Sequence, residues 1–461
     1  MTTISSSFPR RGPRAIGLLA AAGLVLAGSY LVSGIPPTEP AAQPGATLAP
    51  DAAPEDAAPI DGGGAPLGSL AQIDHSIAAW SRNLADNPRD FLASTNVAAL
   101  YQGRARLSYD LGDYERALSA ARTGLSIEPS HAPARALEAG ILYSLHDFAG
   151  AFTAADALLR DDPSQIGALA TRFDAALELG RIDAARADLQ LLTDAGGPAV
   201  LIRQARYASV TGDASGAYEL AREARAAALD DDVENLGFYA YAAGEYARLA
   251  GDPGAARAGF AEALALRADD LAALVGLARI DAFDGRTDAA IDGLRRATAI
   301  APQPESLALL GDLLAMRPSA GANATEATDA HATVRFIARL GDVQAATYDR
   351  QLLRFELDHD GANEVLLARA RASSDERPDW SGHDTVAWAL YRLGRFDDAA
   401  MSIATARELG ADDARLRFHA GAIQLARGDA VGGQALLSSA LDLGPALDPI
   451  ERAEASWLLG G

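Results

Sequence analysis

The sequence predicts an all-α protein built from consecutive helix–turn–helix units, and three observations support that prediction. Turn-forming glycines recur at intervals of about 34 residues over much of the chain. Small residues, mainly Ala, follow these glycines at the spacing of one helix face. Aromatic residues are only 6% of the 461, while apolar residues reach 49%. This composition favours helices that pack closely through small side chains.

The stretch LGDYERALSAARTGLSIEP, residues 111–129, shows one unit. Gly112 is expected at the turn between two helices. After it, Ala117, Ala121 and Gly124 recur at i, i+4 and i+7, which places them on one face of the second helix. Pro129 ends that helix, because a proline disfavours α conformation in the residue before it.

The same pattern returns along the chain. His146 takes the turn position 34 residues after Gly112, and the last two turns are again 34 residues apart. The expected turn glycines are Gly112, Gly180, Gly212, Gly251, Gly285, Gly394 and Gly428.

This period resembles the tetratricopeptide repeat family, in its bacterial exported or membrane-anchored form. The resemblance implies a right-handed α-solenoid of about ten repeats over residues 71–461. Capping helices are expected at its two ends, with Ser69 and Asp448 as their N-caps. The polar stretch at 317–335 departs from the pattern, so we expect the array to bend or loosen there.

Residues 1–34 are predicted to be a signal peptide or a signal anchor. Arg10, Arg11 and Arg14 precede 18 uncharged, mostly apolar residues at 15–32. The arginines predict that the following chain lies outside the cytoplasm, either anchored or secreted after cleavage. Residues 35–70 are rich in Pro, Ala and Gly, which predicts a disordered linker.

The charge and the missing residue types exclude several functions. The net charge is −22, which argues against a nucleic-acid partner. All 40 basic residues are Arg and there is no Cys, so a P-loop lysine and thiolate chemistry are excluded. We expect no catalytic residue, metal or cofactor. The one metal alternative considered is a site at His359 and His383, which adjacent repeats could bring together.

The family resemblance implies that first helices line a concave, partner-binding face. In the C-terminal units the groove positions are then Tyr348, Gln351, Phe355, Asp358, Asp384, Trp388, Tyr391 and Phe418. Rigid aromatics with a few charges suit peptide binding. The alternative is that these rings fill space between helices.

Three functional hypotheses follow. The first is a non-enzymatic extracytoplasmic scaffold that binds a peptide or protein in its concave groove. The second is a structural or assembly factor of an envelope complex, acting through its acidic outer surface. The third is a metal-dependent enzyme with a site at His359 and His383.

Overall fold

The computed structural model describes residues 69–228, 231–317, 321–340 and 342–460. The segment at 1–34 and nearly all of the predicted linker lie outside the described residues. Within those four ranges, no helix is both long and apolar enough to cross a membrane.

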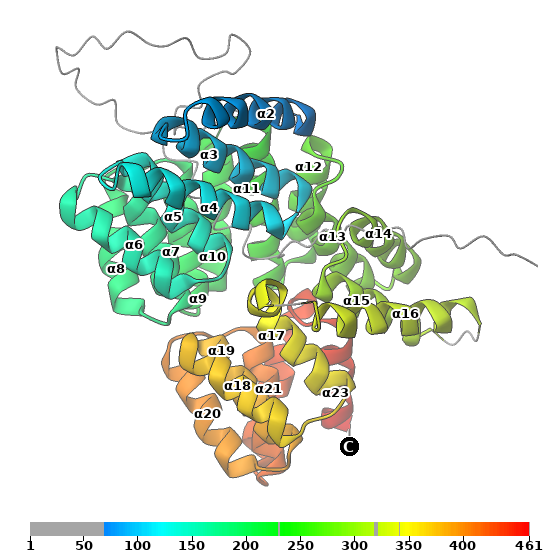
Figure 1. Ribbon diagram of the computed structural model, residues 1–461. Helices are drawn as coiled ribbons and strands as arrows, with labels where there is room; N and C mark the ends of the chain where they lie inside the picture. The colour runs from blue at the N-terminus through cyan, green and yellow to red at the C-terminus, as the bar shows by residue number, and fades with distance from the viewer. Residues whose placement is uncertain (1–68, 229–230, 318–320, 341, 461) are drawn as a thin grey trace, which may run out of the picture.

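The described chain is all-helical, which confirms the predicted fold class. A leading helix, α2 (Leu70–Asp86), comes first, and Ser69 caps it in a capping box with Gln72. Ten helix pairs follow (Figure 1). The first five pairs are α3 (Phe91–Ser108) with α4 (Leu111–Ile127), α5 (Ala132–Ser144) with α6 (Phe148–Asp161), α7 (Ile166–Glu178) with α8 (Ile182–Thr193), α9 (Pro198–Val210) with α10 (Ala214–Ala227), and α11 (Val233–Leu249) with α12 (Pro253–Leu266).

The second five pairs complete the array. They are α13 (Leu271–Phe283) with α14 (Thr287–Ile300), α15 (Pro304–Ala315) with α16 (Ala322–Ile337), α17 (Asp342–His359) with α18 (Glu364–Glu376), α19 (Trp380–Arg392) with α20 (Phe396–Glu408), and α21 (Ala414–Ala426) with α22 (Ala430–Asp442). A short 3-10 turn, η1 (Gly444–Ala446), leads to the closing helix α23 (Pro449–Gly460).

Several turns inside the pairs combine a left-handed glycine with an aspartate cap. Gly212 has φ +90° and Gly428 has φ +90°, a conformation that glycine adopts without steric cost. The next residue, Asp213 or Asp429, accepts a hydrogen bond from a backbone N–H three residues later and so starts the second helix. Gly180, Gly251, Gly285 and Gly394 also have positive φ.

The first turn differs from the prediction. Gly112 lies inside α4, and the left-handed position falls to Tyr109, with φ +60°. Asp110 caps α4 by accepting from the Gly112 N–H at 3.0 Å, which starts the helix earlier than expected. The Tyr109 ring is buried, and its hydroxyl accepts from the Leu271 N–H at 3.4 Å. Tertiary packing therefore holds a conformation that tyrosine rarely adopts alone.

The polar stretch, where we expected the array to bend or loosen, contains most of α16. This helix packs along α15 as a regular second helix. Its alanines at 327 and 330 and Val334 are buried, so the polar residues between them occupy the outer face. Helix α16 packs only sparsely on the next helix, α17, so a looser array after α16 stays a prediction.

The chain winds back on itself, so that helices α17 to α23 lie beneath helices α2 to α12 in Figure 1. A Cβ built on Gly180 would stand only 2.4 Å from the Pro378 carbonyl oxygen, and one on Gly212 only 2.8 Å from that of Gly410. Arg248 donates from Nη1 to the carbonyl oxygens of Pro445 and Ala446, at 2.9 and 3.2 Å. Turns of the early pairs thus touch connections that lie about 200 residues later.

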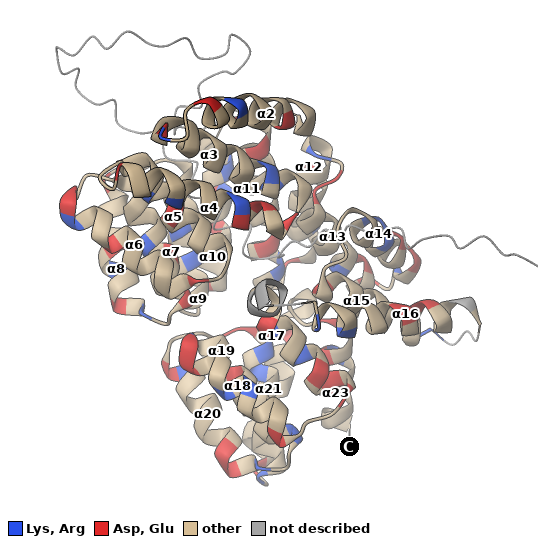
Figure 2. Cartoon of the chain, viewed as in Figure 1, with Lys and Arg blue, Asp and Glu red and all other residues tan. Residues whose placement is uncertain are grey.

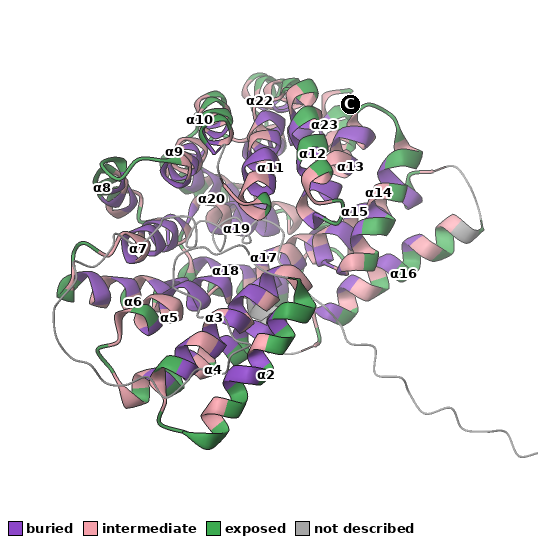
Figure 3. Ribbon diagram, turned by 90° about the horizontal axis from the view of Figure 1, so that it is seen from above, coloured by how far each residue is buried: buried purple, intermediate pink, exposed green. Residues whose placement is uncertain are grey.

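First helices of distant repeats contact one another in the interior of the superhelix. Arg106 of α3 forms an ion pair with Glu234 at the start of α11, joining two first helices across it. Helix α17 lies centrally in Figure 3, where buried residues face the interior. Tyr348 of α17 belongs to one hydrophobic cluster with Ala98 of α3 and Ile141 of α5. The solenoid therefore packs its own helix where an open groove was expected.

Candidate functional site

The predicted groove residues separate into a buried group and a cavity-lining group. Tyr348, Asp384, Trp388 and Phe418 are each at most 3% exposed, so they do not present an open binding face. Tyr391 is half-buried and stacks on Trp388. The rings of Tyr348, Trp388 and Phe418 therefore fill the space between helices, as the alternative interpretation has it. A groove role for the half-buried Tyr391 stays a prediction.

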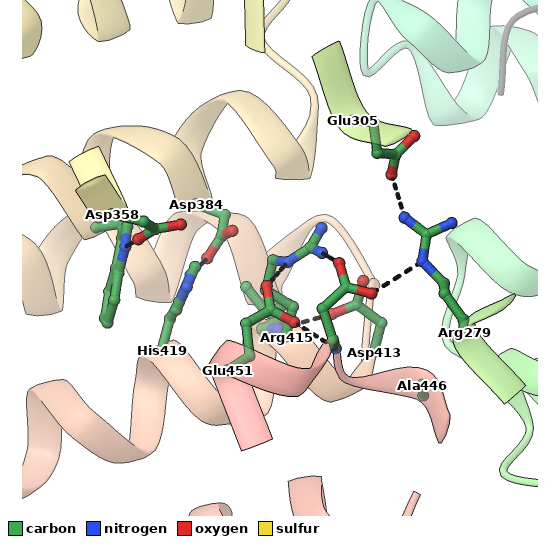
Figure 4. Close-up of polar contacts among 12 residues, drawn as sticks. Arg279, Glu305, Asp358, Asp384, Asp413, Arg415, His419, Ala446 and Glu451 are labelled. Carbon is green, nitrogen blue, oxygen red and sulfur yellow. Dashed lines mark hydrogen bonds and ion pairs between the residues drawn. The ribbon is translucent and has the colours of Figure 1, made fainter. Parts of the chain in front are cut away.

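Trp388 is the centre of the buried group. Its indole stacks on His419, with ring centroids 4.0 Å apart, and Nε1–H donates to Asp358 at 2.8 Å (Figure 4). His419 Nδ1 lies 2.8 Å from the buried Asp384 carboxylate. Each polar atom in these contacts has a partner, as buried groups in a structural core require.

Gln351, Phe355 and Asp358 line a cavity of about 90 Å³. Residues of α15, α17, the start of α21 and the start of α23 form its walls. The charged lining residues are Glu305, Asp312, Arg354, Asp358, His359, Arg415, Asp448 and Glu451. The cavity exists because α23 returns to pack beside α15, a contact that no local pattern in the sequence encodes.

The carboxylates that line the cavity already have cationic or hydrogen-bonding partners (Figure 4). Glu305 and Asp448 each pair with Arg279, at 2.7 and 2.8 Å. Glu451 pairs with Arg415. Of these three ion pairs, Arg279–Asp448 connects distant parts of the chain, because Arg279 lies on α13 and Asp448 just before α23.

Asp358 is similarly satisfied. Besides the Trp388 indole, it lies 3.5 Å from the Arg392 guanidinium, which also pairs with Glu454. Asp448 is the most strongly perturbed acid of the site. Burial alone would raise the pKa of Asp448, but the Arg279 and Arg415 guanidinium groups outweigh burial and lower that pKa.

Arg354 is the exception among the charged lining residues. Its guanidinium forms no hydrogen bond or ion pair with the described part of the chain, although it faces a lining rich in charge. The neighbouring Arg415 charge, together with burial, lowers the pKa of Arg354. A guanidinium carries five N–H donors, and a carboxylate accepts two of them in a bidentate pair. Glu305, Glu451 and Asp448 act on Arg354 electrostatically, but the N–H donors of its guanidinium are open to a hydrogen-bonding anion.

One wall of the cavity holds a cluster of two histidines and an aspartate. The Asp312 carboxylate oxygen Oδ1 lies 3.0 Å from His331 Nε2 and 2.7 Å from His359 Nε2. His359 therefore meets His331 and Asp312, and not the predicted partner His383, which lies outside both this cluster and the cavity lining.

The sequence reasoning missed Asp312, His331 and Arg354. His331 falls in the polar stretch that had been expected to interrupt the array, which hid its place on a helix. Gly311 was the available signal, since a small residue there lets the facing side chain of α16 approach α15. No sequence pattern identifies Arg354, because the cavity that it lines forms only when α23 packs beside α15.

No protein-family model and no curated protein matches this sequence. Solved structures with a similar fold include a thermophilic tetratricopeptide repeat protein of Thermus thermophilus, at 19% identity and a TM-score of 0.32, covering 38% of this chain and 92% of that one. A tetratricopeptide repeat protein of Parabacteroides merdae has 17% identity and a TM-score of 0.31, covering 57% and 98%.

The Cut9–Hcn1 hetero-tetramer of the APC/C also matches, at 12% identity and a TM-score of 0.31, covering 85% of this chain and 93% of that one. These likenesses concern the fold alone. The repeat geometry of this chain defines it as an α-solenoid of tetratricopeptide-like helix pairs, closed by capping helices at both ends.

Proposed function

We propose that this protein is a non-enzymatic scaffold that binds a segment of a protein partner at the cavity between α15, α17 and α23. The observation that supports the proposal is Arg354, a guanidinium without a hydrogen bond or ion pair to any described residue, in a cavity whose carboxylates are already paired. A carboxylate from a partner would give the Arg354 guanidinium a hydrogen-bonded ion pair.

The chemistry of the cavity limits the partner. A cavity of about 90 Å³ accepts one carboxylate group and a few water molecules, and it is too small for a folded element. The net charge of −22 repels strongly acidic partners at long range. The proposed ligand is therefore a single Asp, Glu or C-terminal carboxylate on an otherwise neutral or basic segment.

We also propose that the repeat domain works outside the cytoplasm, held there or released by residues 1–34. The support is the sequence pattern of three arginines followed by the apolar run at 15–32. A scaffold in that compartment would meet envelope or secreted proteins as partners.

The test is crosslinked capture by full-length protein in cells, with a reagent that does not cross the cytoplasmic membrane. Arg354→Gln should lose the partner that the wild type captures, since the amide keeps a polar side chain but removes the charge. Arg407→Gln is the matched control, because Arg407 is exposed on α20, away from the cavity. A captured segment is then synthesised with either its acidic side chain or its C-terminus amidated, which identifies the bound carboxylate. Equal capture by both variants would contradict the proposal.

A further inference from the structure

Three separate helices bring Asp312, His331 and His359 to one point. Asp312 is on α15, His331 on α16 and His359 on α17. One potential ligand atom from each residue lies within 4.8 Å of the other two. Two imidazole nitrogens and a carboxylate oxygen are a ligand set that divalent transition metals, Zn²⁺ above all, bind in proteins.

The two imidazoles are aimed and held. His331 Nε2 and His359 Nε2 both face Asp312 Oδ1, at 3.0 and 2.7 Å. The Phe355 ring stacks on His359 with centroids 4.3 Å apart and meets His331 edge-on at 5.4 Å. All three metal-ligand side chains are 12 to 16% exposed, so they are largely shielded but remain open to a small ion.

His359 has the second contact that metal-binding histidines usually have. Its Nδ1 lies 2.9 Å from the Phe355 carbonyl oxygen, which can only accept. Nδ1 therefore donates its hydrogen to that carbonyl, and Nε2 donates to the Asp312 carboxylate while no ion is bound. An ion that displaces the Nε2 proton would bind at Nε2, the atom that faces Asp312 and His331. A backbone carbonyl on the far nitrogen fixes the tautomer and orientation of a metal-ligating imidazole.

The backbone of α15 makes room for this arrangement. A Cβ built on Gly311 would stand 2.3 Å from both Cδ2 and Nε2 of His331. No other residue type fits at 311 without displacing the imidazole. His331 can therefore reach the Asp312 carboxylate in this position only because residue 311 is glycine.

We propose that Asp312, His331 and His359 form a binding site for one divalent transition-metal ion, with Zn²⁺ as the best-matched ion. The site has three protein ligands, and Asp312 and His359 also line the cavity. A further coordination position therefore faces the cavity, as in zinc sites that keep a position for water or an exogenous ligand. The ion would link α15, α16 and α17, the helices that lead from the upper to the lower half.

The inference does not depend on the proposed partner, so it is tested on the full chain alone. Chelator-treated protein is titrated with Zn²⁺ by calorimetry and with Co²⁺ by visible absorption. We expect one ion per chain and the d–d bands of a nitrogen and oxygen ligand set. His331→Gln and His359→Gln should each weaken Zn²⁺ binding by more than about tenfold.

His383→Gln is the matched control, because it removes a half-buried histidine outside the cluster. It should bind Zn²⁺ like the wild type. Circular dichroism of the metal-free variants checks that each one is folded. The proposal is overturned if the folded wild type takes up no stoichiometric Zn²⁺ or Co²⁺, or if the His331 and His383 variants bind Zn²⁺ equally.

Discussion

At the residue scale, His146 shows how the fold perturbs a single side chain. It occupies the turn between α5 and α6 with φ +63°, and its ring stacks on Phe148. Neither ring nitrogen has a hydrogen-bond partner in the described part of the chain. Burial, reinforced by the Arg377 and Arg350 charges, lowers the pKa of His146 to about 3 from an ordinary value of 6.5.

This shift makes stability depend on pH. Between pH 6.5 and about 3 the unfolded chain binds a proton at this position and the folded chain does not, so the free energy of unfolding falls as pH drops. From pH 7 to pH 5 the loss from this one group is about 2 kcal/mol. His146→Asn, which tolerates the left-handed turn, should lack this loss.

Urea unfolding of the wild type and the Asn variant at both pH values measures the difference. The wild type should lose more stability than the variant on acidification. Parallel losses would show that the ring is protonated in the folded state.

The residue scale is also where prediction from sequence was least complete. The glycines at 180, 212 and 428 were recognisable because a left-handed turn selects glycine directly. Tyr109 was not recognisable, since a buried contact with the Leu271 N–H holds it in that conformation. Asp312, His331 and His359 are separated by 19 and 28 residues, spacings that match no metal motif.

At the element scale, small residues set the distance between paired helices. A Cβ built on Gly259 of α12 would stand 2.6 Å from the Gly244 Cα of α11. Real Cβ atoms do not approach backbone this closely. Helices α11 and α12 can therefore pack at this distance only because Gly244 and Gly259 have no side chains. Gly293 of α14 is also helical, but its Cβ would have an ordinary contact at 3.6 Å.

This contrast predicts opposite effects of one substitution. Gly259→Ala must separate α11 from α12 and should lower stability by about 1 to 3 kcal/mol, the usual range for overpacking. Gly293→Ala should raise it by about 0.5 to 1 kcal/mol, because alanine costs less conformational entropy in a helix. Thermal unfolding of both variants measures whether each substitution raises or lowers the stability. Stabilisation by both would contradict the packing at Gly259.

The period in the sequence predicted the helix pairs well because each pair is a local unit. The small residues of its packing face recur at fixed spacing in the sequence, as at Ala117 and Ala121, which are both fully buried. The helix around residue 330 was not recognisable from the sequence, since its polar residues outnumber the few buried ones that attach α16 to α15.

At the whole-molecule scale, the second half of the solenoid packs beneath the first and fills the interior. Acidic residues and arginines are interspersed over both halves in Figure 2, and the ion pair between Arg279 and Asp448 crosses between them. The Arg279–Asp448 pair spans 169 positions. A repeat pattern in the sequence reports only on contacts between adjacent helix pairs. It could therefore predict neither the contact between the two halves nor the burial of Trp388 and Phe418.

The closure of the two halves can be measured by a disulfide in a chain that has no cysteine of its own. The Thr211 Cβ lies 3.9 Å from the place of a Cβ on Gly410, within the range of a disulfide. Thr211→Cys with Gly410→Cys should therefore form an intramolecular disulfide on oxidation, seen by non-reducing electrophoresis and peptide mass spectrometry. Thr211→Cys with Gly394→Cys is the control, because Gly394 has the same left-handed strain and no described atom within 4 Å of its Cβ position. A disulfide in the first variant alone supports the wound-back solenoid and its cavity, whereas no disulfide in either, or equal formation in both, would contradict them.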